Sequence, residues 1–340
     1  MKKMFALFVL SLIVINDSFA KIWRVNNVTG VAADFITAQA ANDGAANGDT
    51  IHLEPSLNTY GDLTLTKRLY IISTGNFLLQ NPGFQQSIVA GFLSNIRIYE
   101  GGANGSILSV RFSGVMDIRS QGVSDILLLS CASTVSQNEC LGAAAGVLYV
   151  ENADNIIARN CWFASIDIAA TSENIIINNN IIGNRISIRG GSSATITNNV
   201  ICAVSTGGCQ DQGIVNSIVA NNIFNKGLVN WGGGFINCLV QNNLSANNTL
   251  PTGNGNQNNV DMTTVFRDAN GGYIDNIYQL KAGSPAIAAG TNGEDCGAFG
   301  GSIPYKLANT PPIPSIYKLT VPPSSGGNSM NIIFSTRSNN

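Results

Sequence analysis

Two short segments set polar side chains between isoleucines, where the polar groups could bind or act on a ligand. In Ile166-Asp167-Ile168 and Ile186-Ser187-Ile188 strand geometry would turn the central side chain to the face opposite the isoleucines. Arg185 and Arg189 flank the second segment and would lie on that same face. An outward aspartate can bind calcium or transfer a proton, and an arginine can pair with a carboxylate.

Other segments of the chain add aromatic and charged groups to this face. Leu148-Tyr149-Val150 would expose its tyrosine, and Met116-Asp117-Ile118-Arg119 would expose its aspartate and its arginine. Aromatic rings can stack on sugar rings, so we expect Tyr149 and Trp231 to flank a centre formed by Asp167, Arg185 and Arg189. The alternative is a solvated face with ordinary ion pairs, such as Asp167 beside Arg185, which would contribute little stability.

Five segments of the chain align with one another without internal gaps, each an apolar stretch followed by asparagine. The matched asparagines recur every 19 to 23 residues. The repeats are rich in Ile, Val, Asn and Gly and show no sustained helical period, so they indicate short strands. The asparagines at the matched position are Asn160, Asn179, Asn198, Asn221 and Asn242.

A repeat of this kind predicts an all-β fold, a single right-handed parallel β-helix whose coils contain roughly 20 residues each. Equivalent residues of such a solenoid stack about 4.8 Å apart along its axis. Asparagines stacked at a turn can hydrogen-bond side chain to side chain, which satisfies amides that are costly to bury. We therefore predict a structural ladder at the five matched asparagines. Between residues 75 and 150 the repeat is too degenerate to align.

The two ends of the repeat region carry motifs of their own. Residues 34–41 have the spacing of a short amphipathic helix that would cap the open solenoid. Gly48-Asp49-Thr50-Ile51 and Leu63-Thr64-Leu65-Thr66-Lys67 follow the helix, and Gly283-Ser284-Pro285-Ala286-Ile287 and Asp295-Cys296-Gly297-Ala298-Phe299 lie near the far end. Over residues 22–301 these motifs resemble secreted bacterial right-handed parallel β-helix proteins of the pectin-lyase-like superfamily.

The resemblance implies an extended polysaccharide bound along one exposed parallel sheet. In that setting arginines would pair with uronate carboxylates, and Asp117 or Asp167 would bind calcium or transfer a proton. No other cofactor is expected. The Gly-His-Gly and Arg-Ile-Lys segments of polygalacturonase-type enzymes are absent from the sequence, as are the pectate-lyase signatures. No sequence motif therefore supports a lyase or glycoside hydrolase activity. The alternative function is that of a non-catalytic structural or adhesive cell-surface protein.

The chain begins with the pattern of a signal peptide. Two lysines precede an apolar run, and a small-residue junction ends at residue 20. We expect a secreted or cell-surface protein with three parts, the signal peptide at 1–20, the β-helix at 21–301 and a proline-rich linker with a short hairpin or anchoring tail at 302–340. No later segment is long and apolar enough to predict a membrane span.

Composition narrows the classes of partner. Charged residues make up 11% of the chain and the net charge is -2, so we expect no nucleic-acid partner and no basic run that would hold an acidic membrane surface. We expect the protein to be a monomer, and we expect its partner to be an extracellular polysaccharide. With one histidine, His52, and no CxxC pair, a zinc site is not predicted. Cys131 and Cys161 occupy equivalent repeat positions and would either stack as thiols or bridge adjacent coils.

Overall fold

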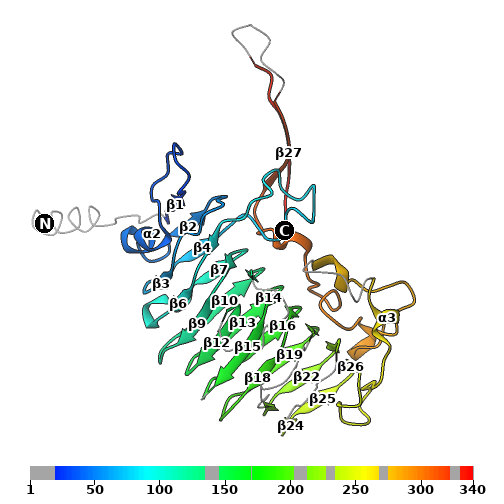
Figure 1. Ribbon diagram of the computed structural model, residues 1–340. Helices are drawn as coiled ribbons and strands as arrows, with labels where there is room; N and C mark the ends of the chain where they lie inside the picture. The colour runs from blue at the N-terminus through cyan, green and yellow to red at the C-terminus, as the bar shows by residue number, and fades with distance from the viewer. Residues whose placement is uncertain are drawn as a thin grey trace, which may run out of the picture.

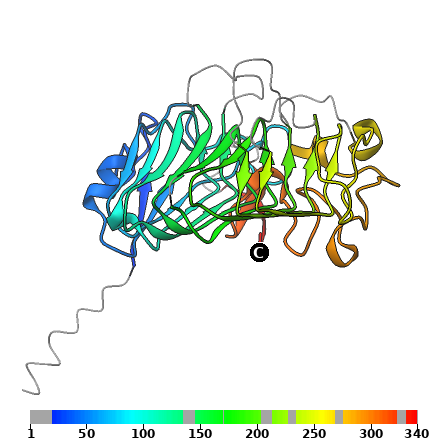
Figure 2. The ribbon, with the colours of Figure 1, turned by 90° about the horizontal axis from the view of Figure 1, so that it is seen from below.

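A computed structural model describes residues 20–134, 145–169, 171–202, 213–226, 234–267, 275–321 and 330–339. Almost all of the predicted signal peptide and Trp231 therefore lie outside the described residues. Within them, short parallel strands stack into three long sheets around a common core, as Figures 1 and 2 show. This arrangement confirms the predicted parallel β-helix.

Each coil of the solenoid passes through the three sheets in the same order, which we name sheets B, A and C. Sheet B consists of β3 (Leu63–Leu65), β6 (Ile96–Ile98), β9 (Val115–Arg119), β12 (Val147–Glu151), β15 (Ser165–Ala169), β18 (Ile186–Ile188), β21 (Ile214–Val215) and β24 (Phe235–Ile236). Sheet A consists of β1 (Ile22–Val25), β2 (Thr50–Leu53), β4 (Tyr70–Ile72), β7 (Ser106–Leu108), β10 (Ser124–Leu129), β13 (Asp154–Arg159), β16 (Ile175–Asn178), β19 (Ala194–Thr197), β22 (Ile218–Ala220) and β25 (Leu239–Gln241).

Sheet C has the shortest strands and completes each coil. It consists of β5 (Phe92–Leu93), β8 (Arg111–Phe112), β11 (Ala132–Ser133), β14 (Trp162–Phe163), β17 (Ile181–Ile182), β20 (Val200–Ile201), β23 (Ile223–Phe224) and β26 (Leu244–Ser245). In sheets A and B, inward apolar residues, many of them isoleucine, alternate with outward residues along most strands. The inward residues of all three sheets form one continuous core inside the coils.

The capping helix that we predicted is present as α2 (Ala38–Gly44). It begins later than the predicted segment because the Thr37 side chain accepts a hydrogen bond from the backbone N of Ala40, at 3.2 Å, and so sets the N-cap. Lys67 Nζ donates to the carbonyl oxygens of Asn42, Asp43 and Ala45, at 2.8–3.0 Å, where the helix ends. Among the described residues no helix is long and apolar enough to cross a membrane.

A ladder of buried amides runs along the turn between sheets A and C, one residue after the predicted column. Asn199 Oδ1 accepts hydrogen bonds from the backbone N and from Nδ2 of Asn180, at 2.9 and 3.0 Å. Each further rung repeats this pattern, so every buried amide is bonded to the next coil. The ladder consists of the buried Asn180, Asn199, Asn222 and Asn243, and it ends at the half-buried Asn256.

The asparagines at the predicted position have a different structural role. All five adopt a left-handed backbone, with φ of 53–59°, which asparagine tolerates better than other residues with a side chain. Their side chains can then bond the segment that follows the solenoid: Asn179 Nδ2 donates to the carbonyl oxygens of Ala298 and Gly300, at 3.0 and 2.8 Å. The members of this turn column are Asn160, Asn179, Asn198, Asn221 and Asn242.

After β26 the chain runs back along the outer face of sheet C. It contains α3 (Met262–Val265) and the 3-10 helices η2 (Asp275–Tyr278), η3 (Thr291–Gly293) and η4 (Leu307–Asn309), with η1 (Glu100–Gly102) lying earlier, between β6 and β7. Outward residues of sheet C, from Trp162 to Leu244, pack with this segment into a second core. The strands of the solenoid thus end at Ser245, well before residue 301. Beyond the segment, β27 (Ser315–Thr320) and β28 (Ile333–Arg337) pair as an antiparallel hairpin.

Candidate functional site

The outer face of sheet B brings together the side chains that alternate with its core residues. Strand register places Asp117 level with Tyr149, and Tyr149 level with Asp167, on three consecutive coils. The column continues to Arg97 on one side and to Ser187 on the other. These five residues therefore lie on successive strands, with neighbours about 4.8 Å apart.

A polar hollow includes the first two residues of this column, on the N-terminal half of sheet B. It has a volume of about 320 Å³ and is lined by Arg97, Ile98, Tyr99, Asp117, Arg119 and Glu151. Glu151 is level with Arg119 on the neighbouring strand. The ring of Tyr99 is 46% exposed, so one face of the hollow offers an aromatic surface next to two arginines.

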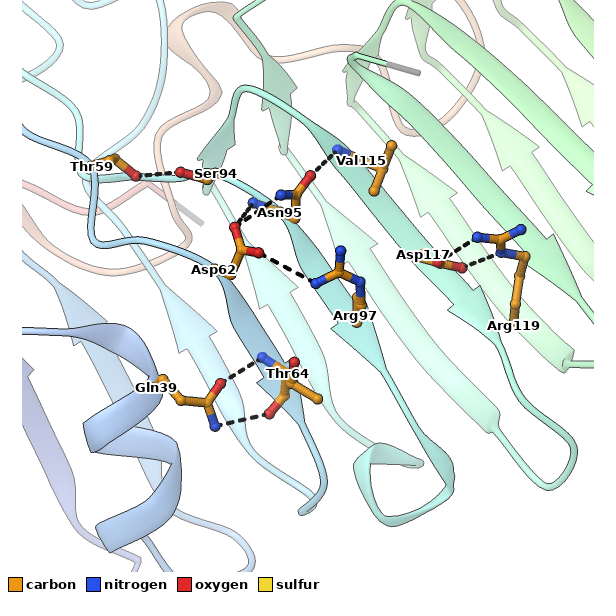
Figure 3. A network of polar contacts seen from close by, with 10 residues as sticks. All are labelled: Gln39, Thr59, Asp62, Thr64, Ser94, Asn95, Arg97, Val115, Asp117 and Arg119. Carbon is orange, nitrogen blue, oxygen red and sulfur yellow. Dashed lines mark hydrogen bonds and ion pairs between the residues drawn. The ribbon is translucent and has the colours of Figure 1, made fainter. Parts of the chain in front are cut away.

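Arg119 is held by a bidentate ion pair on its own strand. Its Nε and Nη2 atoms donate to Asp117 Oδ1 and Oδ2, at 2.6 and 2.8 Å (Figure 3). Its guanidinium carbon also lies 5.1 Å from the centre of the Tyr149 ring. The hydrogen bond with Asp117 raises the pKa of Arg119 above its ordinary value. This pairing fixes a planar group in the floor of the hollow.

Arg97 lies on β6, the strand next to that of Arg119, and it has its own carboxylate partner. Its Nη1 lies 3.3 Å from Asp62 Oδ2, and Asp62 Oδ1 also accepts from Asn95 Nδ2 at 2.9 Å. Asn95 Oδ1 in turn accepts from the backbone N of Val115, at 3.0 Å. Figure 3 shows this network crossing from the turn before β3 to β9. It ties the exposed arginine to the backbone of the next coil.

Of the three residues predicted for the centre of the site, Asp167 and Arg189 form an ion pair. Arg189 donates from Nε and Nη2 to Asp167 Oδ1, at 3.0 and 2.7 Å, in place of the predicted pair between Asp167 and Arg185. Arg185 precedes β18, and its carbonyl oxygen accepts from the backbone N of Ile166 at 2.9 Å. Asp167 is only 9% exposed and Ser187 only 2% exposed, so this end offers less accessible polar surface than the hollow.

Several residues of the hollow were missed by the sequence analysis. Ile96-Arg97-Ile98 has the same alternation that identified Asp167 and Ser187, and this signal could have found Arg97. Tyr99 and Glu151 extend the same outward pattern at the ends of β6 and β12. They were not linked because the coil register between residues 75 and 150 could not be aligned from the sequence.

The described residues contain no group of three or more His, Cys, Asp or Glu side chains that could hold a metal ion. His52 lies away from the hollow, on sheet A and level with Arg24 on β1. Burial lowers its pKa. Cys131 and Cys161 are buried free thiols on adjacent coils, with the backbone N of Cys131 at 3.3 Å from Cys161 Sγ. They stack as core thiols, which was one of the two predicted arrangements.

Two comparisons with known proteins identified no family for this chain. A scan against models of protein families found no match to the chain. A search of curated proteins found no significant match either. The sheets and the hollow themselves define the class of protein, which is a parallel β-helix with a polar face on sheet B.

Proposed function

We propose that this chain is an exported bacterial β-helix protein of the pectin-lyase-like kind that binds an extracellular polysaccharide across the outer face of sheet B. The observation that carries the proposal is the hollow between Arg97 and Glu151, because it combines an exposed tyrosine with hydrogen-bonding groups on consecutive coils. Side chains repeated at the strand spacing suit a ligand that is itself an extended repeating chain. The leader-like residues 1–20 support export.

The charges of the face favour a neutral glycan over a polyuronate. Each of three outward arginines has an aspartate partner: Arg97 with Asp62, Arg119 with Asp117, and Arg189 with Asp167. An arginine that is already neutralised attracts a uronate carboxylate only weakly, whereas the pair still offers donors and acceptors to sugar hydroxyls. We therefore revise the expectation that these arginines pair with uronates, and we propose a hydroxyl-rich, uncharged saccharide as the ligand.

The first test is a binding screen of the chain from residue 21 onward against neutral and acidic polysaccharides, read by affinity gel electrophoresis. We expect retardation by a neutral glycan that persists at high salt, because paired charges make little net electrostatic contribution. The release of unsaturated ends, followed by absorbance with and without calcium, would show whether a lyase reaction accompanies binding. Retardation by no glycan would contradict the proposal and favour the alternative of a non-catalytic structural or adhesive surface protein.

Two matched pairs of variants locate the binding face. Arg119→Ala and Arg24→Ala each remove an arginine that is paired with a carboxylate. The two arginine side chains are 47% and 50% exposed, but Arg119 lies on sheet B and Arg24 lies on sheet A. Tyr99→Ala and Tyr70→Ala likewise compare tyrosines near sheet B and on sheet A that are 46% and 40% exposed. We expect a loss of roughly tenfold or more in glycan affinity for the sheet B variants and none for the sheet A variants. Equal losses in both would place the ligand elsewhere.

A further inference from the structure

The hairpin β27–β28 exposes more apolar side chains than its place in the fold explains. Eight large apolar residues of the hairpin and its flanks are 37–66% exposed, and none of them belongs to either core of the molecule. Contiguous exposed apolar surface of this kind marks an interaction site. The residues are Ile316, Tyr317, Leu319, Val321, Met330, Ile332, Ile333 and Phe334.

The hairpin is bonded to Gln86 along β27 as far as Leu319, and it projects away from the solenoid (Figure 1). Gln86 donates from its backbone N to the carbonyl oxygen of Ile316 at 2.9 Å, and its Oε1 accepts from the backbone N of Leu319 at the same distance. The guanidinium carbon of Arg337 lies 4.5 Å from the centre of the Phe84 ring. A fixed base with exposed apolar side chains beyond it has the form of an anchor, whereas a loose tail would lack such contacts.

Apolar and basic residues are distributed unequally along the hairpin. Leu319 pairs with Phe334, and Thr320 with Ile333, toward the distal end, so apolar side chains stand on both faces there. Arg337 pairs with Ser315 at the base, and Lys318 lies between the base and the distal end. From residue 296 to residue 340 the sequence has three basic residues, with Lys306 as the third, and no Asp or Glu.

We propose that this hairpin is a peripheral anchor that inserts its distal apolar residues into an anionic lipid surface. A protein groove covers one face of a bound ribbon, whereas the last described pairs of this hairpin place apolar side chains on both faces and suit a surrounding apolar phase. The basic residues Lys318 and Arg337 lie closer to the base than Ile333 and Phe334, and their charge matches that of anionic headgroups. Insertion is shallow, since a two-stranded ribbon leaves backbone groups at its edges that must keep contact with water.

The test is co-sedimentation of residues 21–340 with lipid vesicles, because this form retains every described strand and omits the apolar leader-like run. One vesicle preparation is phosphatidylcholine alone, and the other is an equal mixture of phosphatidylcholine and phosphatidylglycerol. We expect binding to the mixed vesicles, weakened by salt and lower on phosphatidylcholine alone. The assay contains no glycan, so its result is independent of the function proposed for sheet B.

Two variants test the hairpin directly. Ile333→Asp combined with Phe334→Asp should lower the ratio of bound to free protein by about tenfold or more, with no change in the thermal midpoint, because neither residue lies in a core. Leu57→Asp is the matched control, since Leu57 is an exposed apolar residue outside the hairpin, and it should bind vesicles like the parent. Lys318→Glu should weaken binding to the mixed vesicles only.

Three results would overturn the proposal. The first is a parent protein that stays in the supernatant with both kinds of vesicle. The second is a hairpin variant that binds vesicles as well as the parent. The third is self-association of the parent, measured by sedimentation velocity without lipid and abolished by Ile333→Asp with Phe334→Asp, in the absence of vesicle binding. That last result would assign the apolar hairpin to a protein partner, a second copy of this chain.

Discussion

The amide of Asn199 is a middle rung of the buried ladder, and each of its atoms has a specific partner. Its Nδ2 donates to the carbonyl oxygens of Ile177 and Thr197 and to Asn222 Oδ1, at 2.8–3.0 Å. Its Oδ1 accepts two hydrogen bonds from Asn180. Removing this amide would take hydrogen-bond partners away from buried donors and acceptors on three coils, at a site that is closed to bulk water.

We therefore expect Asn199→Ala to lower the free energy of unfolding by about 3 kcal/mol or more. Asn178→Ala is the control, because the Asn178 side chain also bonds at both ends, to Arg159 and Asn179, but is only half-buried. Water can replace those bonds, so the control should lose about 1 kcal/mol or less. Urea unfolding followed by circular dichroism measures both values. Similar losses in the two variants would show that the ladder does not carry the stability assigned to it.

A buried carboxylate gives the protein a pH-dependent stability. Asp275 Oδ1 accepts from Asn81 Nδ2 and Asp275 Oδ2 from the backbone N of Ala308, both at 2.8 Å. Burial raises the pKa of Asp275 to about 6, above its value of about 3.9 in an unfolded chain. Ionisation is thus harder in the folded state, so this group's contribution to stability is fully present below about pH 4 and is lost as pH rises through about 6.

Lowering the pH from about 7 to about 5 should therefore stabilise the parent relative to Asp275→Asn, which does not titrate, by roughly 1 to 2 kcal/mol. The difference between the two thermal midpoints at each pH is the quantity to follow, since the other titrating groups are common to both proteins. A difference that stays constant with pH would mean that Asp275 has an ordinary pKa in the folded protein.

Among the elements, the strands of sheets A and B were easier to predict from the sequence than those of sheet C. Ile96-Arg97-Ile98 alternates because one face of β6 packs into the core and the other is partly exposed. The sheet C strands β14, β17, β20 and β23 instead have two consecutive apolar residues, such as Trp162 and Phe163, because both faces of these strands are covered. That doublet signals a second core, but it does not identify the segment that covers it.

The candidate site was predictable only in part for a related reason. Alternation within a strand identifies outward residues, so Asp117, Tyr149 and Asp167 could be named from the sequence. Which of them are neighbours depends on the number of residues in each turn, and the turns between residues 75 and 150 vary too much to count coils. The pairing of Arg189 with Asp167 depends in addition on side-chain directions across two strands, which spacing in the sequence does not determine.

At the level of the whole molecule, the segment after β26 connects coils that are far apart along the solenoid. Asn309 Nδ2 donates to the carbonyl oxygen of Asn160 at 2.7 Å, and the carbonyl oxygen of Ala308 accepts from the backbone N of Asn76 at the same distance. A solenoid normally has contacts only between neighbouring coils. Here the returning segment adds contacts between early and late parts of the chain. Its loss should therefore destabilise coils at both ends of the solenoid.

Two truncations separate this segment from the hairpin. A chain that ends at residue 310 keeps the contacts of Ala308 and Asn309 and loses residues 311–340, which include β27 and β28 and contribute to neither core. A chain that ends at residue 301, the boundary expected from composition, also loses the buried Tyr305 and the backbone donor that Ala308 offers to Asp275. We expect the first truncation to unfold at the parent's temperature. The second should unfold several degrees lower, because a loss of a few kcal/mol in the free energy of unfolding lowers the thermal midpoint by about that much. Equal midpoints for the two truncations would mean that residues 302–310 do not help to hold the returning segment on sheet C.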